Sequence, residues 1–299
     1  MHAPLSRARG FTLMEMVLAI VILGILGATF GMFIVPAVSA HQALQSRAAL
    51  IDSAEIALRR MARDIRIALP NSVRVSSTVD GFAIEMIPTV DGGRYCVTGD
   101  ANCTAGAQEL LIGSSDTDFD ILGCFQSGFN PANKRLVVGD STGAVYSAGG
   151  TNAVVTPAST AITVSVSTGG GATSGACGTS SGASTTNRHH IALSAGQTFP
   201  NSSSRRRVFV IETPVAYVCN KSAGTLTRYS GYAISATQPT PLSPPGGTSA
   251  LVTDKVTDCS VSTSTATVQT QSFVTLSISL VNSNETVKLF DQIQLDNSV

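Results

Sequence analysis

The chain has 299 residues, of which 43% are hydrophobic and 13% are charged, and its 19 basic and 19 acidic side chains leave no formal net charge. A balanced and weakly charged chain gives no electrostatic argument for binding nucleic acid. One apolar segment near the N-terminus leaves roughly 230 residues beyond it, enough for one large β-rich domain or two small ones.

A short basic leader precedes the longest apolar run of the chain. Residues 1–10 include two arginines, and the run from Met16 to Val35 is uncharged, with Glu15 immediately before it. About 20 helical residues rise about 30 Å, the hydrocarbon thickness of a bilayer. Arginines before the run and none immediately after it place the leader in the cytoplasm and the remainder outside.

Two other interpretations of this segment compete with a specialised anchor. Val38-Ser39-Ala40 before His41 has the small-residue pattern of a signal-peptide cleavage site, but the apolar run exceeds a usual h-region of roughly 7–15 residues. A plain membrane anchor leaves Gly10 and Glu15 unexplained. A carboxylate at the start of an apolar span is costly and therefore favours a function for Glu15.

The segment Gly10-Phe11-Thr12-Leu13-Met14-Glu15 resembles the class III leader junction of type IV prepilins. The resemblance implies that a membrane-embedded prepilin peptidase cuts after Gly10 and methylates the new N-terminus at Phe11. It also implies that Glu15 pairs with the terminal amine of a neighbouring subunit during assembly. A free amine in an apolar filament core needs a counter-charge, and Glu15 is the acid available one helical turn away.

The helical pattern continues beyond Pro36 as an amphipathic stripe. Leu44, Ile51, Leu58 and Ile65 repeat every seven residues, and Pro70 marks the expected end. We therefore expect one helix over residues 11–69, with its membrane span at about 11–35 and its second half packed against the exported domain. A length of roughly 55–60 residues gives about 85 Å.

Residues 70–299 are expected to form a large antiparallel β-rich domain. The alternation of Val274, Leu276, Ile278 and Leu280 with polar residues, a turn at 282–284 and a second apolar series to Leu295 predict a closing hairpin. Other short apolar runs predict strands at 82–87, 109–112, 135–138, 161–166 and 208–211. Segments 169–186 and 237–248 are rich in Gly, Ser, Thr or Pro and are expected to be loops.

Six cysteines all follow the anchor, and none forms a C-x-x-C pair: Cys96, Cys103, Cys124, Cys177, Cys219 and Cys259. An even number in an exported domain favours disulfides over zinc or redox chemistry. Six cysteines allow fifteen pairings, and we expect the sequential one.

Segment 189–229, from His189-His190-Ile191-Ala192-Leu193 to Leu226-Thr227-Arg228-Tyr229, resembles the C-terminal region of the MshO proteins of mannose-sensitive haemagglutinin (MSHA) pili. The large size is similar to that of minor subunits, including the J-type pseudopilins of type II secretion. The resemblance implies an α+β, type IV pilin-like fold with a disulfide-bonded C-terminal domain. The implied partners are other minor and major pilin subunits, the prepilin peptidase and the inner-membrane assembly platform.

Three polar clusters are candidate sites. Asp116, Asp118 and Asp120 alternate as at the start of a calcium loop, but Ile121 and Leu122 follow where such a loop needs Gly and a further acid. A solvated turn or edge is favoured, and calcium is the alternative. The pair His189-His190 has no third ligand at metal spacing, and Arg205-Arg206-Arg207 is expected to be a solvated loop.

No nucleophile-base pair, metal motif or phosphate loop is recognisable, so we expect no catalytic residues, resident metal or cofactor. The expected function is structural: a minor subunit that joins a priming or tip complex, held in the inner membrane with a periplasmic domain until it enters the pilus. A type II secretion pseudopilin and a tip adhesin that binds a surface or glycan are the alternatives.

Overall fold

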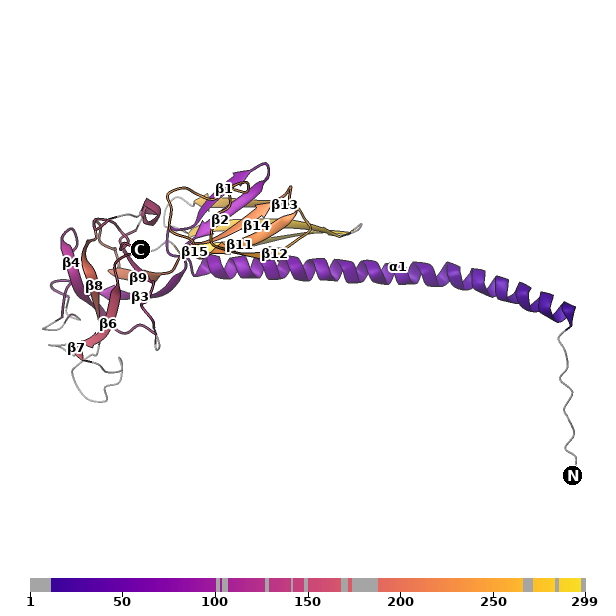
Figure 1. The fold of residues 1–299 in the computed structure, drawn as a ribbon, viewed down its shortest axis with the longest axis horizontal. Coiled ribbons are helices and arrows are strands. Elements are labelled where there is room, and N and C mark those ends of the chain that lie inside the picture. Colours follow the sequence, from indigo (N-terminus) through magenta and orange to yellow (C-terminus); the bar gives the residue numbers. More distant parts are fainter. Residues whose placement is uncertain are drawn as a thin grey trace, which may run out of the picture.

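The computed structural model describes residues 12–100, 103, 107–126, 129–140, 142–147, 150–167, 172–173, 188–265, 271–282 and 285–296. One long helix, α1 (Leu13–Arg66), is followed by antiparallel β-sheets. Figure 1 shows the sheets gathered around and beyond the C-terminal end of α1, while its N-terminal half extends alone. The expected α+β fold class is confirmed.

Helix α1 begins after Thr12, whose hydroxyl oxygen accepts a hydrogen bond from Glu15 N at 3.3 Å. It continues through Pro36 and ends at Arg66, three residues before the expected end at Leu69. The Ile67 carbonyl accepts from Thr89 N at 2.8 Å, and Leu69 N donates to the Ile87 carbonyl at 2.7 Å. These strand-like bonds use backbone groups that a longer helix would need.

The buried face of α1 differs from the predicted seven-residue stripe. Leu58 and Ile65 are buried, but Leu44 and Ile51 are 68% and 37% exposed. The buried positions instead follow spacings of three and four residues from Leu50 to Ile65, the period of one face of a straight α-helix. The other buried residues are Leu50, Ala54, Ala57, Met61 and Ala62.

The proximal lobe is the β-structure that packs on α1. Its five-stranded sheet has the order β1 (Arg74–Thr78), β2 (Gly81–Met86), β10 (Val215–Asn220), β11 (Thr225–Ser230) and β12 (Thr248–Thr253). Its three-stranded sheet contains β13 (Val256–Thr265), β14 (Gln271–Asn282) and β15 (Glu285–Asp296). Apolar residues from both sheets and from α1 form one core, so the second half of the helix is part of this lobe.

The distal lobe contains a seven-stranded sheet and has its own apolar core. The strand order is β5 (Arg135–Val138), β9 (Arg207–Ile211), β3 (Thr89–Tyr95), β4 (Ser115–Leu122), β8 (Arg188–Thr198), β6 (Ile162–Ser167) and β7 (Ala172–Thr173). A short 3-10 helix, η1 (Ala144–Ser147), lies between β5 and β6.

The distal lobe is an insertion in the proximal lobe. Strand β2 precedes it and β10 follows it, yet these two strands pair directly, with Ala83 opposite Val218. Gly81 has a φ of +136°, and a Cβ there would collide with the Cys219 carbonyl oxygen. A glycine therefore allows the close approach of the strands that enclose the insertion.

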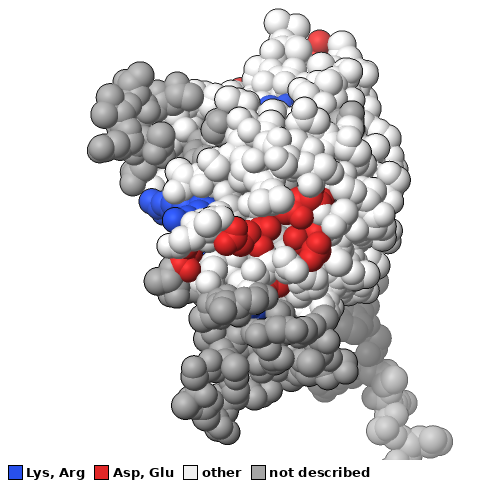
Figure 2. Space-filling model, turned by 90° about the vertical axis from the view of Figure 1, so that its left-hand side faces the viewer, with Lys and Arg blue, Asp and Glu red and all other residues white. Residues whose placement is uncertain are grey.

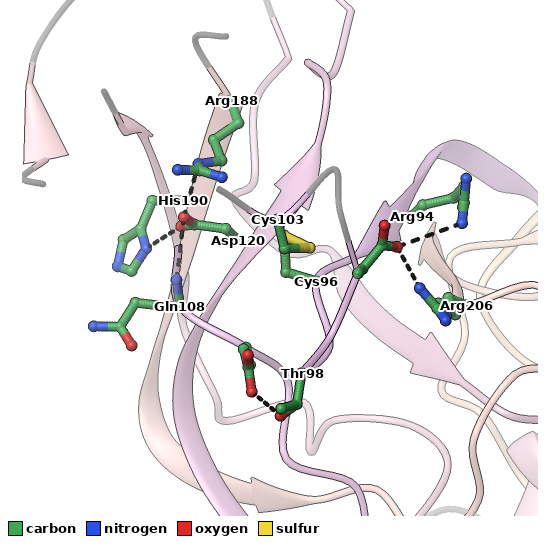
Figure 3. Close-up of a disulfide and its surroundings, with 11 residues drawn as sticks. Arg94, Cys96, Thr98, Cys103, Gln108, Asp120, Arg188, His190 and Arg206 are labelled. Atoms are coloured by element: carbon green, nitrogen blue, oxygen red, sulfur yellow. Dashed lines mark hydrogen bonds and ion pairs between the residues drawn. A yellow bond between two sulfur atoms is a disulfide. The ribbon is translucent and has the colours of Figure 1, made fainter. Parts of the chain in front are cut away.

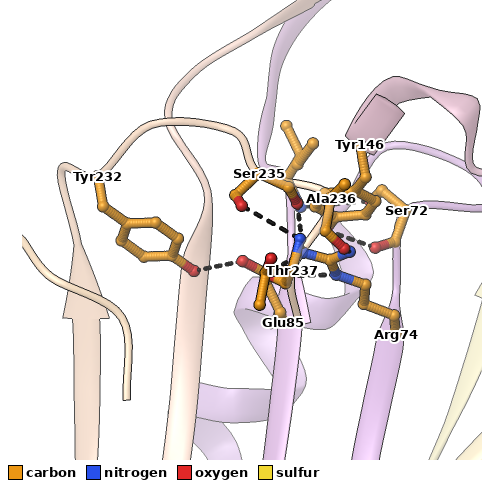
Figure 4. Close-up of polar contacts among 9 residues, drawn as sticks. Ser72, Arg74, Glu85, Tyr146, Tyr232, Ser235, Ala236 and Thr237 are labelled. Atoms are coloured by element: carbon orange, nitrogen blue, oxygen red, sulfur yellow. Dashed lines mark hydrogen bonds and ion pairs between the residues drawn. The ribbon is translucent and has the colours of Figure 1, made fainter. Parts of the chain in front are cut away.

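Arg74 joins the two lobes (Figure 4). From β1 it forms an ion pair with the buried carboxylate of Glu85 on β2 and donates to the carbonyl oxygens of Ser235 and Ala236 at 2.7 and 3.0 Å. Its guanidinium lies 3.6 Å from the ring centre of Tyr146 in η1. The side chain thus contacts β2, the 235–236 loop and the distal segment at once.

Two predictions about local structure were wrong. Segment 109–112 is not a strand; it connects to β4, and Leu110 N donates to the Cys96 carbonyl at 3.0 Å. Asp116, Asp118 and Asp120, expected in a solvated turn or edge, lie in β4, an inner strand of the seven-stranded sheet. The segment is a strand because Phe119 and Ile121 are buried in the distal core, and this tertiary burial outweighs the low strand propensity of aspartate.

Candidate assembly site

The N-terminal half of α1 is an apolar rod. Every residue from Thr12 to Gln42 is exposed, and the helix is long and apolar enough, by length and composition, to cross a membrane. Large apolar side chains that are exposed to this extent indicate a surface made for lipid or for other proteins. This surface is separate from the face of α1 that packs on the proximal lobe.

Glu15 is the one charged side chain in the exposed stretch from Thr12 to Gln42. It lies in the first turn of α1, where the Thr12 cap positions its backbone. A helix N-terminus carries a partial positive charge, which favours a carboxylate there. In an apolar environment a carboxylate at this position would need a further cation as its partner. Gly10 and Phe11 lie outside the described residues.

A polar group on β10 and β11 fixes the other half of α1. Asp64 Oδ2 accepts from the Tyr217 hydroxyl at 2.8 Å and from Arg228 Nε at 2.9 Å. Nearer the middle of the helix, Ser53 Oγ lies 2.8 Å from the hydroxyl oxygen of Thr253 on β12. Burial raises the pKa of the Tyr217 hydroxyl, and its bond to Asp64 adds to the effect. The side-chain pattern of the sequence did not reveal this group.

The three aspartates of β4 do not converge on a common centre. Asp120 is buried and pairs with Arg188 Nε at 3.1 Å and with His190 Nδ1 at 2.8 Å (Figure 3). Asp116 instead accepts from the backbone amide of Leu111 at 2.9 Å. Among the described residues no group of three His, Cys, Asp or Glu side chains is arranged to hold a metal ion, and an arginine occupies the position where a cation would sit.

The histidine pair and the arginine run also have structural contacts. His189 Nδ1 accepts from Phe125 N at 2.9 Å, and burial lowers the pKa of this histidine. Arg206 forms an ion pair with Asp100, which also lies 3.8 Å from Arg94 (Figure 3). These side chains connect the loops of the distal lobe.

The structure contains the disulfides Cys96–Cys103 and Cys219–Cys259, the same two pairs that sequential pairing predicts. The second joins β10 to β13 and so links the two sheets of the proximal lobe, with a Cα–Cα distance of 6.7 Å. For the third expected pair, Cys124 with Cys177, the second cysteine lies outside the described residues.

Figure 2 shows the distal end of the molecule, opposite the N-terminus of α1. Acidic side chains form a short band on this face, basic side chains lie at one edge of the band, and most of the described surface is uncharged. The described part of this face shows no broad basic surface of the kind that binding to a polyanion requires.

Residues 5–30 match the family model of the prokaryotic N-terminal methylation motif. Comparisons with curated proteins and with solved structures found no match. The matched residues include the leader junction and the start of the exposed apolar helix. Together with the order of one long apolar helix and then antiparallel sheets, the motif supports a type IV pilin-like or pseudopilin-like protein that is assembled with other pilins and membrane machinery.

Proposed function

We propose that the chain is a minor type IV pilin-like subunit that joins a priming or tip complex during assembly of an MSHA-type pilus. The observation that carries the proposal is the exposed apolar half of α1 with a single acid, Glu15, in its first turn. A carboxylate there serves assembly, because it can neutralise the terminal amine of an adjacent subunit inside an apolar helix bundle.

Processing and location follow from the same segment. The prepilin peptidase removes residues 1–10 and methylates Phe11, and residues at about 11–35 hold the subunit in the inner membrane with residues 70–299 in the periplasm. The assembly platform then extracts the subunit into the growing filament, where it contacts minor and major pilins. The role is structural, with no catalytic residue.

The position of the distal lobe favours the tip over the shaft. In Figure 1 this lobe lies beyond the C-terminal end of α1. In a filament whose helices run parallel, a lobe in that position occupies the volume of the subunit that was added before it. The first subunit has no such neighbour, so a large distal lobe is accommodated most easily at the tip.

The experiment is deletion of the gene in its own host, with filaments counted by electron microscopy and adhesion and protein secretion measured in parallel. Loss of filaments, restored by the intact gene, supports the priming role. Normal filaments with loss of adhesion would favour a tip adhesin, which the exposed position of the distal lobe makes the second candidate. Normal filaments with loss of secretion would instead identify a J-like pseudopilin.

A further inference from the structure

The β14–β15 hairpin runs back along α1 toward its N-terminal half. The two strands pair over their full length, from Gln271 opposite Asp296 to Asn282 opposite Glu285. Figure 1 shows the end of this hairpin extending beyond the rest of the proximal lobe, beside the middle of α1. Asn282 and Glu285, called the hairpin end below, are therefore the described part of the β-structure that lies toward the apolar half of the helix.

An open cleft of about 620 Å³ separates the hairpin end from α1. The side chains that line it carry hydroxyl, amide and carboxylate groups, apart from one alanine: Ser39, Gln42, Ala43, Gln45 and Ser46 on the helix, and Asn282 and Glu285 on the hairpin. Glu285 is the one charged residue in this lining. The hydroxyl, amide and carboxylate groups of this lining can hydrogen-bond to a hydrated, cationic or zwitterionic group, which an acyl chain cannot do.

The cleft begins where the apolar run of α1 ends. Ser39 follows Val35 by four residues, a rise of about 6 Å along the helix. The headgroup layer on each side of a bilayer is about 5–8 Å thick, since the full bilayer is about 40–45 Å and its hydrocarbon core about 30 Å. With Val35 at the edge of the hydrocarbon, the near side of the cleft lies within the headgroup layer.

We infer that the end of the β14–β15 hairpin contacts the outer headgroup layer of the inner membrane, and that the cleft receives zwitterionic phospholipid headgroups with the Glu285 carboxylate facing their ammonium groups. The inference rests on the membrane anchoring proposed above. It gives the hairpin a function before extraction: the contact sets the height and tilt of the exported lobes over the membrane. Anionic headgroups would be repelled by Glu285.

The chain contains no tryptophan, so one introduced tryptophan reports its own depth. Asn282→Trp places the fluorophore at the hairpin end. Phe290→Trp is the matched control, because Phe290 is 79% exposed on β15 of the same hairpin, about 17 Å from Glu285 at 3.3 Å per residue. Phe30→Trp, inside the apolar run, reports the anchor independently.

Each full-length variant is placed in bilayers of phosphatidylcholine and phosphatidylethanolamine that contain a nitroxide quencher in either the headgroup or the middle of the acyl chain. We expect headgroup nitroxide to quench Asn282→Trp several-fold more than Phe290→Trp, and acyl-chain nitroxide to quench Phe30→Trp. Equal weak quenching of the two hairpin variants, with Phe30→Trp quenched, overturns the inference and leaves the anchor intact. Absence of quenching for Phe30→Trp overturns both proposals.

Charge reversal tests the stated headgroup chemistry. In the Asn282→Trp background, replacing the zwitterionic lipids by phosphatidylglycerol is expected to weaken headgroup quenching, and adding Glu285→Lys is expected to reverse this preference. Lys288→Glu, an exposed charge reversal further along β15, is the matched control and should leave the preference unchanged. Quenching that is indifferent to lipid charge in the parent and in Glu285→Lys would refute the role of Glu285.

Discussion

Asp64 on α1 and Arg228 on β11 are joined by a hydrogen-bonded ion pair of 2.9 Å between Oδ2 and Nε, although 164 positions separate them in the chain. The same carboxylate oxygen accepts from Tyr217 on β10. Side chains from two neighbouring strands thus contact one residue of α1. Apolar contacts are not directional, so they constrain the rotation of α1 and its position along the sheet less strictly. Hydrogen bonds from two strands to one carboxylate oxygen specify both.

Asp64→Asn should destabilise the protein by about 1–3 kcal/mol, because Arg228 keeps its charge in a largely enclosed position and loses its counter-ion. Asp52→Asn, at an exposed position of the same helix, should change the free energy of unfolding by less than about 0.5 kcal/mol. Urea unfolding of the full-length protein in detergent, followed by circular dichroism, measures both. Equal midpoints for the two variants would show that the ion pair adds no stability.

The spacing of apolar residues in the sequence predicted those strands in which one face is buried along the whole length. Val274, Leu276, Ile278 and Leu280 all point into the proximal core, so alternation alone identified β14. The range of β5 was also predicted, because Leu136, Val137 and Val138 form a short apolar run that is entirely buried. In such segments local pattern and tertiary burial agree.

The remaining features depend on partners that are distant in the sequence. Asp120 is buried in β4, where its carboxylate pairs with Arg188 and His190. Both partners lie about 70 positions further along the chain, so the sequence around Asp120 does not indicate them. The insertion of the distal lobe cannot be recognised from local pattern either. Strand β2 pairs with β10, and all strands of the distal lobe lie between these two in the sequence. The polar group at Asp64 was missed for the same reason, because Tyr217 lies 153 positions away.

Alkaline conditions should unfold the protein. Burial raises the pKa of four tyrosines, Tyr95, Tyr146, Tyr217 and Tyr232, and the carboxylates beside Tyr217 and Tyr232 raise it further. Above the ordinary pKa of about 10, the unfolded chain loses phenolic protons that the folded chain keeps. The stabilisation is therefore complete below that pH and falls above it, by about 1.4 kcal/mol per pH unit for each tyrosine still protonated.

Absorbance at 295 nm measures phenol ionisation without interference, because the chain has five tyrosines and no tryptophan. We expect a delayed, steep titration that coincides with loss of the near-ultraviolet circular dichroism signal. Ionisation of all five phenols around pH 10 with the fold intact would show that these hydroxyl groups are accessible in the native protein.

The two described disulfides should contribute unequally. Cys219–Cys259 spans 40 positions and Cys96–Cys103 spans 7. Restriction of the unfolded chain then gives about 4 kcal/mol for the first and about 2.5 kcal/mol for the second. The double variants Cys219→Ala/Cys259→Ala and Cys96→Ala/Cys103→Ala serve as controls for each other in urea unfolding. A larger loss from the short loop would contradict this ranking.

The mature protein should begin at Phe11 and carry a methylated N-terminus. Intact mass measurement of protein extracted from membranes tests this directly, with protein from a strain that lacks prepilin peptidase as the unprocessed control. Gly10→Val should block cleavage, because a peptidase that requires glycine before the cut has no space for a branched side chain. A start at His41 would instead identify an ordinary signal peptide and would remove the anchor.

Glu15→Ala should impair incorporation into the filament while leaving export, cleavage and the β-lobes intact. The carboxylate contacts nothing in the described β-structure, so its loss affects only contacts between subunits. Without it, the amine of a neighbouring subunit enters an apolar core unpaired, at a cost of about 3 kcal/mol for a charge at mid-membrane depth.

Glu55→Ala is the matched control, because Glu55 lies on the same helix and pairs with Arg59 at its surface. Immunoblots of sheared filaments and of membranes measure the two pools. Normal incorporation of Glu15→Ala would exclude Glu15 from assembly, whereas an equal defect in Glu55→Ala would indicate general damage to α1.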